Sequence, residues 1–154
     1  MTETAVQDRY PDAVSHCYGC GRLNPDGLHI RSFRDGDEAV CHFQPRPYHI
    51  AIPGFVYGGL IASLIDCHAM GTAAAAALAG APADDESPRF VTASLKVDYL
   101  RPTPLGPLLE LRGRVVELTA RKAVVSVTVT VDGAVTARGE VVAVRMPVDW
   151  QPTA

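Results

Sequence analysis

The sequence contains no basic cluster, no secretory signal and no run apolar enough to cross a membrane. It has 154 residues with 14 Lys and Arg against 17 Asp and Glu, and a formal net charge of -3 at pH 7. A nucleic-acid backbone is therefore a poor partner. The N-terminus lacks the basic flank and apolar stretch of a signal peptide, and residues 58–83 are too rich in alanine for a membrane span. We expect a cytoplasmic protein with neither kind of partner.

Cysteine is also scarce. Cys17, Cys20, Cys41 and Cys67 are too few for a secreted disulfide scaffold, so we expect reduced thiols. Cys17-x-x-Cys20, with His16 beside it, resembles half of a zinc site. A structural zinc site needs four ligands, however, and no second Cys-x-x-Cys motif follows. The sequence therefore predicts no bound metal. The Gly-x-Ser-x-Gly motif of serine hydrolases is absent as well.

Hydrophobic periodicity divides the chain into three parts. Residues 1–27 hold prolines, glycines and no usable period, which predicts an irregular N-terminal arm. Residues 28–146 read as one domain, and residues 147–154 as a C-terminal tail. The domain opens with a short hairpin over residues 28–43 and a proline-rich loop. Apolar residues then recur at helical spacing over residues 58–78, with alanine between them, which predicts one helix of about twenty residues.

Alternating apolar and polar residues predict strands after this helix. The strands are expected over residues 90–100, 109–115, 123–131 and 135–144, as an antiparallel meander. Asp132-Gly133 is a signal for a two-residue hairpin. Strands with one apolar face and a single long helix bury their surfaces best when the sheet wraps around the helix. The pattern therefore predicts an α+β domain with the hotdog fold, an antiparallel sheet wrapped around one long central helix.

Asp66 is the most informative residue for function. It is the only Asp, Glu, Lys or Arg between Pro47 and Ala83, and no cation stands one helical turn away from it. A carboxylate without a partner on a largely buried helix is costly, and such costs are kept where a function needs them. The competing interpretation is a solvated carboxylate on an exposed stripe. We take Asp66 as the leading catalytic candidate.

Tyr57-Gly58-Gly59 stands where the helix is expected to begin. The first amides of a helix have no partner within it, and the helix dipole there favours developing negative charge. A plain loop-to-helix junction gives the same pattern. Gly58 and Asp66 are eight residues apart, about 12 Å along a helix, so one helix does not easily offer both groups to one carbonyl. This spacing predicts a dimer in which one protomer gives the amide and the other the carboxylate.

Two segments carry a specific resemblance. PGFVYGGLIASLIDCHAMG and VTASLKVDYLRPTPLG are similar to the hotdog acyl-CoA thioesterases of the phenylacetate-degradation and thioesterase-superfamily-member type, as is the arm's CYGCGRLNPDGL. The resemblance implies that Gly58 is the oxyanion donor, Asp66 the nucleophile or general base, and Thr92 a hydroxyl that orients water or the carboxylate. It implies no metal or redox cofactor. Tyr57 departs from the family, which has histidine at this position.

Our leading hypothesis is hydrolysis of an acyl-CoA thioester by a homodimer or homotetramer. Tyr57 and Gly59 border the reacting carbonyl, His49 lies in the loop that enters the helix, and Lys96 and Arg101 are candidates for the CoA phosphates. Two alternatives stay open. One is a hotdog protein that binds acyl-CoA or another small ligand without catalysis, and the other is a hydratase or dehydratase that uses His49 with a carboxylate.

Overall fold

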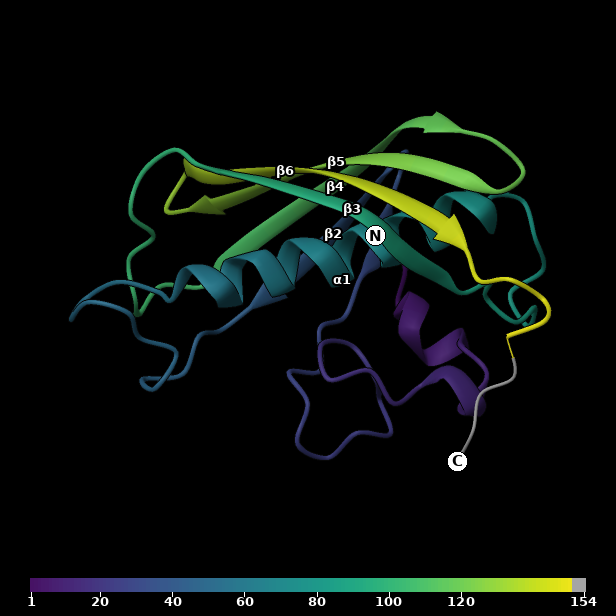
Figure 1. Cartoon of the computed structure of the whole chain (residues 1–154), viewed down its shortest axis with the longest axis horizontal. Coiled ribbons are helices and arrows are strands. Elements are labelled where there is room, and N and C mark those ends of the chain that lie inside the picture. Colours follow the sequence, from purple (N-terminus) through teal and green to yellow (C-terminus); the bar gives the residue numbers. More distant parts are fainter. Residues whose placement is uncertain (151–154) are drawn as a thin grey trace.

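One long helix lies across a single six-stranded antiparallel sheet in this computed structural model (Figure 1). The model describes residues 1–150, so the last four residues of the predicted tail, 147–154, lie outside the described residues. The helix is α1 (Gly58–Ala77). The strands are β1 (Phe33–Asp35), β2 (Glu38–Phe43), β3 (Phe90–Tyr99), β4 (Leu109–Leu118), β5 (Lys122–Val131) and β6 (Ala134–Arg145). This is the predicted α+β hotdog arrangement.

The strand order corrects the predicted meander. The sheet runs β1-β2-β4-β5-β6-β3, so β3 pairs with β6 at one edge and β4 lies beside β2. Only β4, β5 and β6 form a meander. Alternation shows which face of a strand is apolar, but it does not show which strand is the neighbour. The proline-containing connection over residues 100–108 is too long for a tight hairpin, and it allows β4 to start away from β3.

The opening hairpin is shorter than predicted. Its first strand, β1, begins only at Phe33, because the preceding backbone pairs with the arm instead. The Leu28 amide donates to the Tyr18 carbonyl at 2.8 Å and the Ile30 amide to the Gly19 carbonyl at 2.9 Å. The predicted Asp132-Gly133 hairpin is confirmed, since both residues have positive φ and join β5 directly to β6.

Small residues let α1 approach the sheet closely. Ala69 and Ala73 are fully buried, as are Leu64 and Ile65 of the same core cluster. A methyl group at Gly139 of β6 would lie 2.4 Å from the Ile65 side chain, so glycine is required at this crossing. By length and composition α1 resembles a membrane span, but 72% of the apolar window is buried inside the fold. Such burial is typical of a core helix.

A β-bulge in β3 determines which side chains face the helix. Thr92 pairs with Ala143 and Ser94 with Val142, so Ala93 is an extra residue in the strand. Strict alternation would put Thr92 and Tyr99 on opposite faces, because they are seven positions apart. The bulge places both on the face toward α1, where each makes a hydrogen bond to the helix.

The N-terminal arm packs on the side of α1 away from the sheet, where Figure 1 draws it in purple. It contains two 3₁₀ turns, Val6–Arg9 and Asp12–Val14, and Tyr10 is part of the buried core.

His68, fully buried in α1, joins the arm, the hairpin and the helix in one hydrogen-bond network. Ser32 Oγ donates to His68 Nδ1 at 2.8 Å, and His68 Nε2 donates to the Ala39 carbonyl at 3.1 Å. Gln7 Nε2 donates to Ser32 Oγ at 3.2 Å. These partners fit a neutral ring with its proton on Nε2. His68 therefore has a structural role in the packing of the core.

Candidate active site

Asp66 projects from the middle of α1 toward β3. Its carboxylate accepts a hydrogen bond from Thr92 Oγ1 at 2.5 Å, and it forms no ion pair with any residue of the described range 1–150. Burial raises the pKa of Asp66, and the hydrogen bond from Thr92 opposes part of this rise. The structure thus brings the two residues together as expected, around a half-buried carboxylate.

The N-terminus of α1 presents two amides without an acceptor. Tyr57 precedes the helix, and its N–H donates to the His49 carbonyl at 3.0 Å. Leu60 N–H donates to the Tyr57 carbonyl at 3.1 Å. Between them, the N–H groups of Gly58 and Gly59 donate to no oxygen within residues 1–150. These two donors, at the positive end of the helix dipole, are suited to an oxyanion.

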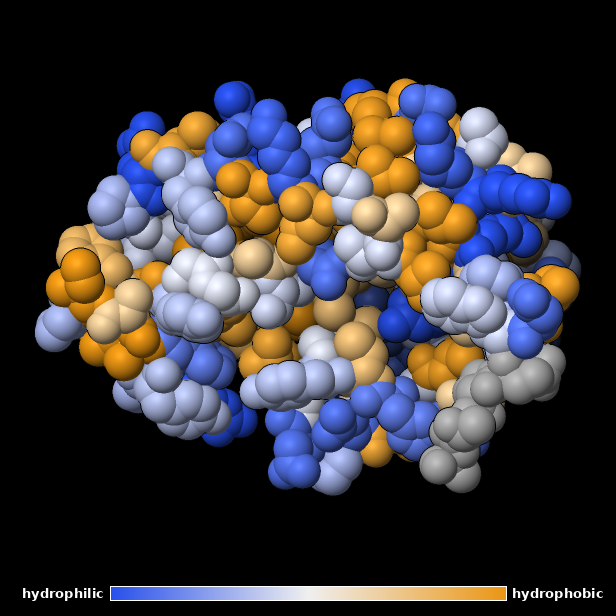
Figure 2. All heavy atoms as spheres, in the orientation of Figure 1, coloured by the Kyte–Doolittle hydropathy of each residue, from blue (hydrophilic) through white to orange (hydrophobic). Residues whose placement is uncertain are grey.

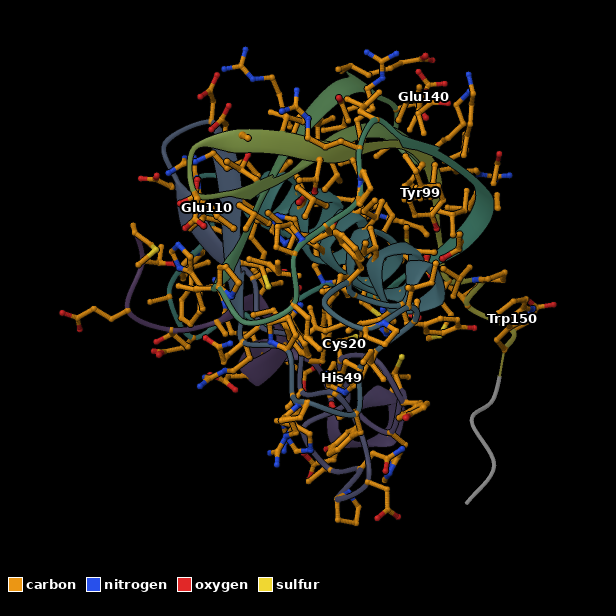
Figure 3. All side chains as sticks on the ribbon, turned by 90° about the vertical axis from the view of Figure 1, so that its left-hand side faces the viewer. Cys20, His49, Tyr99, Glu110, Glu140 and Trp150 are labelled. Atoms are coloured by element: carbon orange, nitrogen blue, oxygen red, sulfur yellow. The ribbon has the colours of Figure 1, made fainter. Side chains whose placement is uncertain are left out.

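Tyr99 is a site residue that the sequence reasoning did not single out. Its hydroxyl donates to the Gly58 carbonyl at 2.7 Å, so the end of β3 holds the first residue of α1 in place. Figure 3 shows Tyr99 on the strand beside the helix. The signal was available as the Tyr-x-x-Pro sequence at Tyr99–Pro102, but the pattern alone gave no reason to connect this tyrosine with Gly58.

An apolar cavity of about 510 Å³ opens beside these amides. Its lining includes Gly58, Tyr99 and Arg101, with Ile52, Phe55 and Ile61 supplying most of the apolar surface. Figure 2 shows hydrophobic side chains gathered at this left-hand end of the molecule, over the loop before α1. Ile52 is 72% exposed. The structure therefore places the predicted Arg101 at the rim of an apolar cavity that also contains the predicted oxyanion donor.

Three other predicted residues take different places. The Tyr57 side chain is exposed, and its ring lies so close to Gly59 that a methyl group there would meet it at 2.4 Å. His49 contributes its carbonyl to the helix entrance, while its Nδ1 accepts from the Arg46 amide at 2.9 Å. Lys96 lies after the bulge on the face of β3 away from α1, so it does not join Asp66 within one protomer.

The free edge of β3 lies beside Asp66 and Thr92. Asp66 and Gly58 stand more than two turns apart on α1. β3 is the last strand of the sheet, and residues 92–96 are all exposed, on both faces. An edge strand of this length with an exposed Leu95 is suited to pair with another copy. Such pairing adds a second surface beside Asp66 and Thr92.

The arm contributes an unexpected feature next to Asp66. The sulfur atoms of Cys17, Cys20 and Cys67 lie within 4.8 Å of one another. The sequence offered only Cys17 and Cys20, with His16, as candidate ligands here, but α1 supplies a third cysteine, Cys67. Sequence spacing does not reveal this, since Cys67 is 47 positions after Cys20 and only the packing of the arm on α1 joins them.

Comparison with known proteins gives the family. Residues 53–138, more than half of the chain, match the thioesterase superfamily. The chain belongs to this family. Among curated relatives, it is 39% identical to the acyl-coenzyme A thioesterase THEM4 of Xenopus laevis over 83 residues, which are 54% of this chain and 33% of that protein. It is 31% identical to THEM4 of Bos taurus over 121 residues, 70% of this chain and 46% of that protein. The chain thus spans less than half of these relatives.

Several solved structures share the fold. A thioesterase superfamily protein from Shewanella loihica PV-4 is 49% identical, with a TM-score of 0.69 over 88% of this chain and 98% of that one. The E. coli PaaI protein of the phenylacetic acid degradation operon is 17% identical, with a TM-score of 0.65 over 78% of this chain and 81% of that one. The smu.793 protein of Streptococcus mutans, solved with acetyl-CoA, is 20% identical, with a TM-score of 0.62 over 76% and 88%.

Proposed function

We propose that this thioesterase-superfamily protein hydrolyses an acyl-CoA thioester to free CoA and a carboxylic acid. The observation that carries the proposal is Asp66, a half-buried carboxylate that forms no ion pair within residues 1–150 and is held by Thr92 at the open edge of the sheet. Family membership supports thioester hydrolysis as the general reaction.

The reaction needs only two kinds of group. The thioester carbonyl accepts hydrogen bonds from the Gly58 and Gly59 amides, which stabilise the negative charge that develops on its oxygen. Asp66 then attacks the carbonyl carbon directly or takes a proton from an attacking water. When Asp66 acts as the base, the water oxygen bonds to the carbonyl carbon, the carbon–sulfur bond breaks, and the proton taken from water passes to the departing sulfur of CoA. When Asp66 attacks directly, the same bond breaks to leave a mixed anhydride on Asp66, which water then hydrolyses to the carboxylic acid while a proton from that water passes to the CoA thiolate. A thioester is already activated, so one carboxylate and one oxyanion site are sufficient.

We place each active site between two protomers. Gly58 of one copy and Asp66 of the other meet at one carbonyl when two β3 edges pair, because the separation along one helix is too large for a single protomer. The exposed residues 92–96 support this pairing. Arg101, at the rim of the apolar cavity, is the candidate for a CoA phosphate, and the cavity itself is the candidate for the acyl chain.

The hydratase alternative receives less support. A hydratase of this type pairs a catalytic histidine with a carboxylate, but the His49 ring accepts a backbone amide instead. Within residues 1–150 the contact between a histidine and a carboxylate is His42 with Glu110, at 3.1 Å on exposed surface. Arg112 also binds Glu110 and lowers the pKa of that carboxyl, so the pair is part of a surface charge network.

The test is release of free thiol from a panel of acyl-CoAs, from short to long and including an aromatic ester. We expect turnover of at least one ester by the wild type. An Asp66→Asn protein purified in the same way controls for contaminating thioesterases. Binding of the esters without thiol release, by both proteins, would overturn the proposal in favour of a binding protein.

A further inference from the structure

The three-thiol cluster of Cys17, Cys20 and Cys67 has the spacing of a metal site. The Sγ atoms of Cys17 and Cys67 are 3.9 Å apart, and all three sulfurs lie within 4.8 Å of one another. Two thiolates on a tetrahedral zinc ion, each about 2.3 Å from the metal, lie about 3.8 Å apart. A disulfide needs about 2.05 Å, so the cluster as folded is closer to metal geometry than to a bond.

The loop that carries Cys17 and Cys20 is built to reach the helix. Gly19 lies so close to Cys67 that a methyl group at position 19 would come within 2.2 Å of the Cys67 sulfur. A methyl group at Gly21 would come within 2.4 Å of the Cys17 backbone, and the Gly21 amide donates to the Cys17 carbonyl at 2.8 Å. Any side chain at these two positions would push the sulfurs apart.

A second, independent observation concerns Tyr10 and Arg89, which lie against the cluster. The Tyr10 side chain is 3% exposed, and its buried hydroxyl has no hydrogen-bond partner. The Arg89 guanidinium stacks over the Tyr10 ring at 4.9 Å and lies 3.9 Å from the Cys20 sulfur. An unpaired hydroxyl buried beside thiols is costly unless a further ligand completes the site.

We propose that Cys17, Cys20 and Cys67 bind one divalent metal ion of the zinc type and leave its fourth position to solvent or an exogenous ligand. Three thiols release three protons as one such ion binds, which leaves one negative charge in excess. Arg89 supplies the matching positive charge, as an outer partner of a ligating sulfur. The ion ties the arm to α1 one residue from Asp66.

The experiment uses the full chain, reduced and freed of metal with a chelator. Addition of Zn²⁺ should give one bound ion per chain and a higher melting temperature, because the ion binds the folded state. Addition of Co²⁺ should produce thiolate-to-metal charge-transfer absorption. Cys17→Ser and Cys67→Ser should each weaken zinc binding by at least roughly 100-fold, more than the loss of an outer partner costs. Cys41→Ser is the matched control, since Cys41 is buried outside the cluster.

Three results would overturn the proposal. The first is that the reduced wild type binds no zinc. The second is that the Cys67→Ser protein binds zinc as tightly as the wild type. The third is that the Co²⁺ spectrum shows no thiolate absorption. Circular dichroism shows whether each variant folds. If Cys67→Ser does not fold, Cys17→Ser decides, because Cys17 is only partly buried and its loss leaves α1 intact.

Discussion

At the scale of single residues, keeping Asp66 charged at neutral pH costs the folded protein free energy. Its environment favours the uncharged carboxyl through burial, while Thr92 supports the charged form with one hydrogen bond. Within residues 1–150 Asp66 forms no ion pair, and the charge of Arg89 lowers its pKa by less than burial raises it. A residue in this state is a candidate for reactivity rather than a source of stability. Packing does not explain Gly58 either. A methyl group there would lie 3.5 Å from the Tyr99 ring, which is an ordinary contact, so packing within one protomer does not require glycine.

Asp66→Asn should abolish most turnover and leave the fold intact. The amide keeps the size and the acceptor for Thr92, but it removes the negative charge, so hydrolysis should fall by roughly 10²- to 10⁴-fold for loss of a general base. The free energy of unfolding should stay equal or rise, because a half-buried charge is removed. Thiol release and chemical denaturation measure the two effects. Asp98→Asn, which removes an exposed carboxylate paired with Arg138, should retain activity.

Gly58→Pro should remove one oxyanion donor without breaking the helix. Proline is tolerated at the first helical position, and Tyr57 already has φ -58° and ψ 127°, which suit a residue before proline. The hydrolysis rate should fall by roughly 10²- to 10³-fold. Gly58→Ala keeps the N–H and should lose far less. Equal rates for the two variants would show that the Gly58 amide does not bind the oxyanion.

Sequence reasoning singled out the candidate catalytic residues but not the residues that surround them. Asp66 was evident from its isolation, and Thr92 came from the family resemblance. The hydrogen bond between them depends on the bulge at Ala93, which no alternation pattern reveals. Tyr99 and the third cysteine, Cys67, were missed for the same reason, because each meets its partners only through tertiary packing.

Local sequence signals determine where helices and strands form more closely than they determine which strands pair. The predicted helix ends within one residue of the observed α1, since its alanine-rich period and the stop at Gly80 are local signals. The position of β3 beside β6 is not local, because it depends on the long connection over residues 100–108. The junction of the arm, the hairpin and α1 is likewise tertiary, and it centres on the buried His68.

Acid should weaken this junction through His68. Burial lowers the pKa of His68 from 6.5 to about 4, so between these values the unfolded chain binds a proton that the folded protein does not. The stability that the neutral ring contributes is therefore present above pH 6.5 and is lost as the pH falls toward 4, by roughly 3 kcal/mol. His68→Gln does not titrate. Denaturation at a series of pH values should show a shallower decline for this variant, and equal slopes would contradict the account.

At the scale of the whole molecule, the proposed active site is shared between two copies of the chain. The open edge of β3 carries exposed Leu95, and both Asp66 and Thr92 lie behind this edge. The sequence suggested a dimer from the Gly58-to-Asp66 spacing alone, and this oligomeric state stays a prediction.

Leu95→Lys should convert the wild-type oligomer into a folded, inactive monomer. Leu95 is 40% exposed in one chain, so the isolated protomer tolerates a charged side chain there. When two β3 edges pair, the two lysines would bring like charges together and oppose the pairing. Light scattering and thiol release are the measurements. Val116→Lys introduces the same charge at a more exposed site on β4 and should stay oligomeric and active. A monomeric, active wild type would contradict the shared site.

Mixing two inactive variants tests the central claim most directly, because it asks whether one protomer's Asp66 works with another's Gly58. Asp66→Asn and Gly58→Pro proteins are unfolded and refolded together in equal amounts, and thiol release is compared with each variant refolded alone. Half of the dimers then contain both variants, and one of their two sites has both native groups, so activity should recover to about one quarter of the wild-type level. Activity no greater than the average of the two variants, with mixed dimers present, would contradict a site shared between protomers.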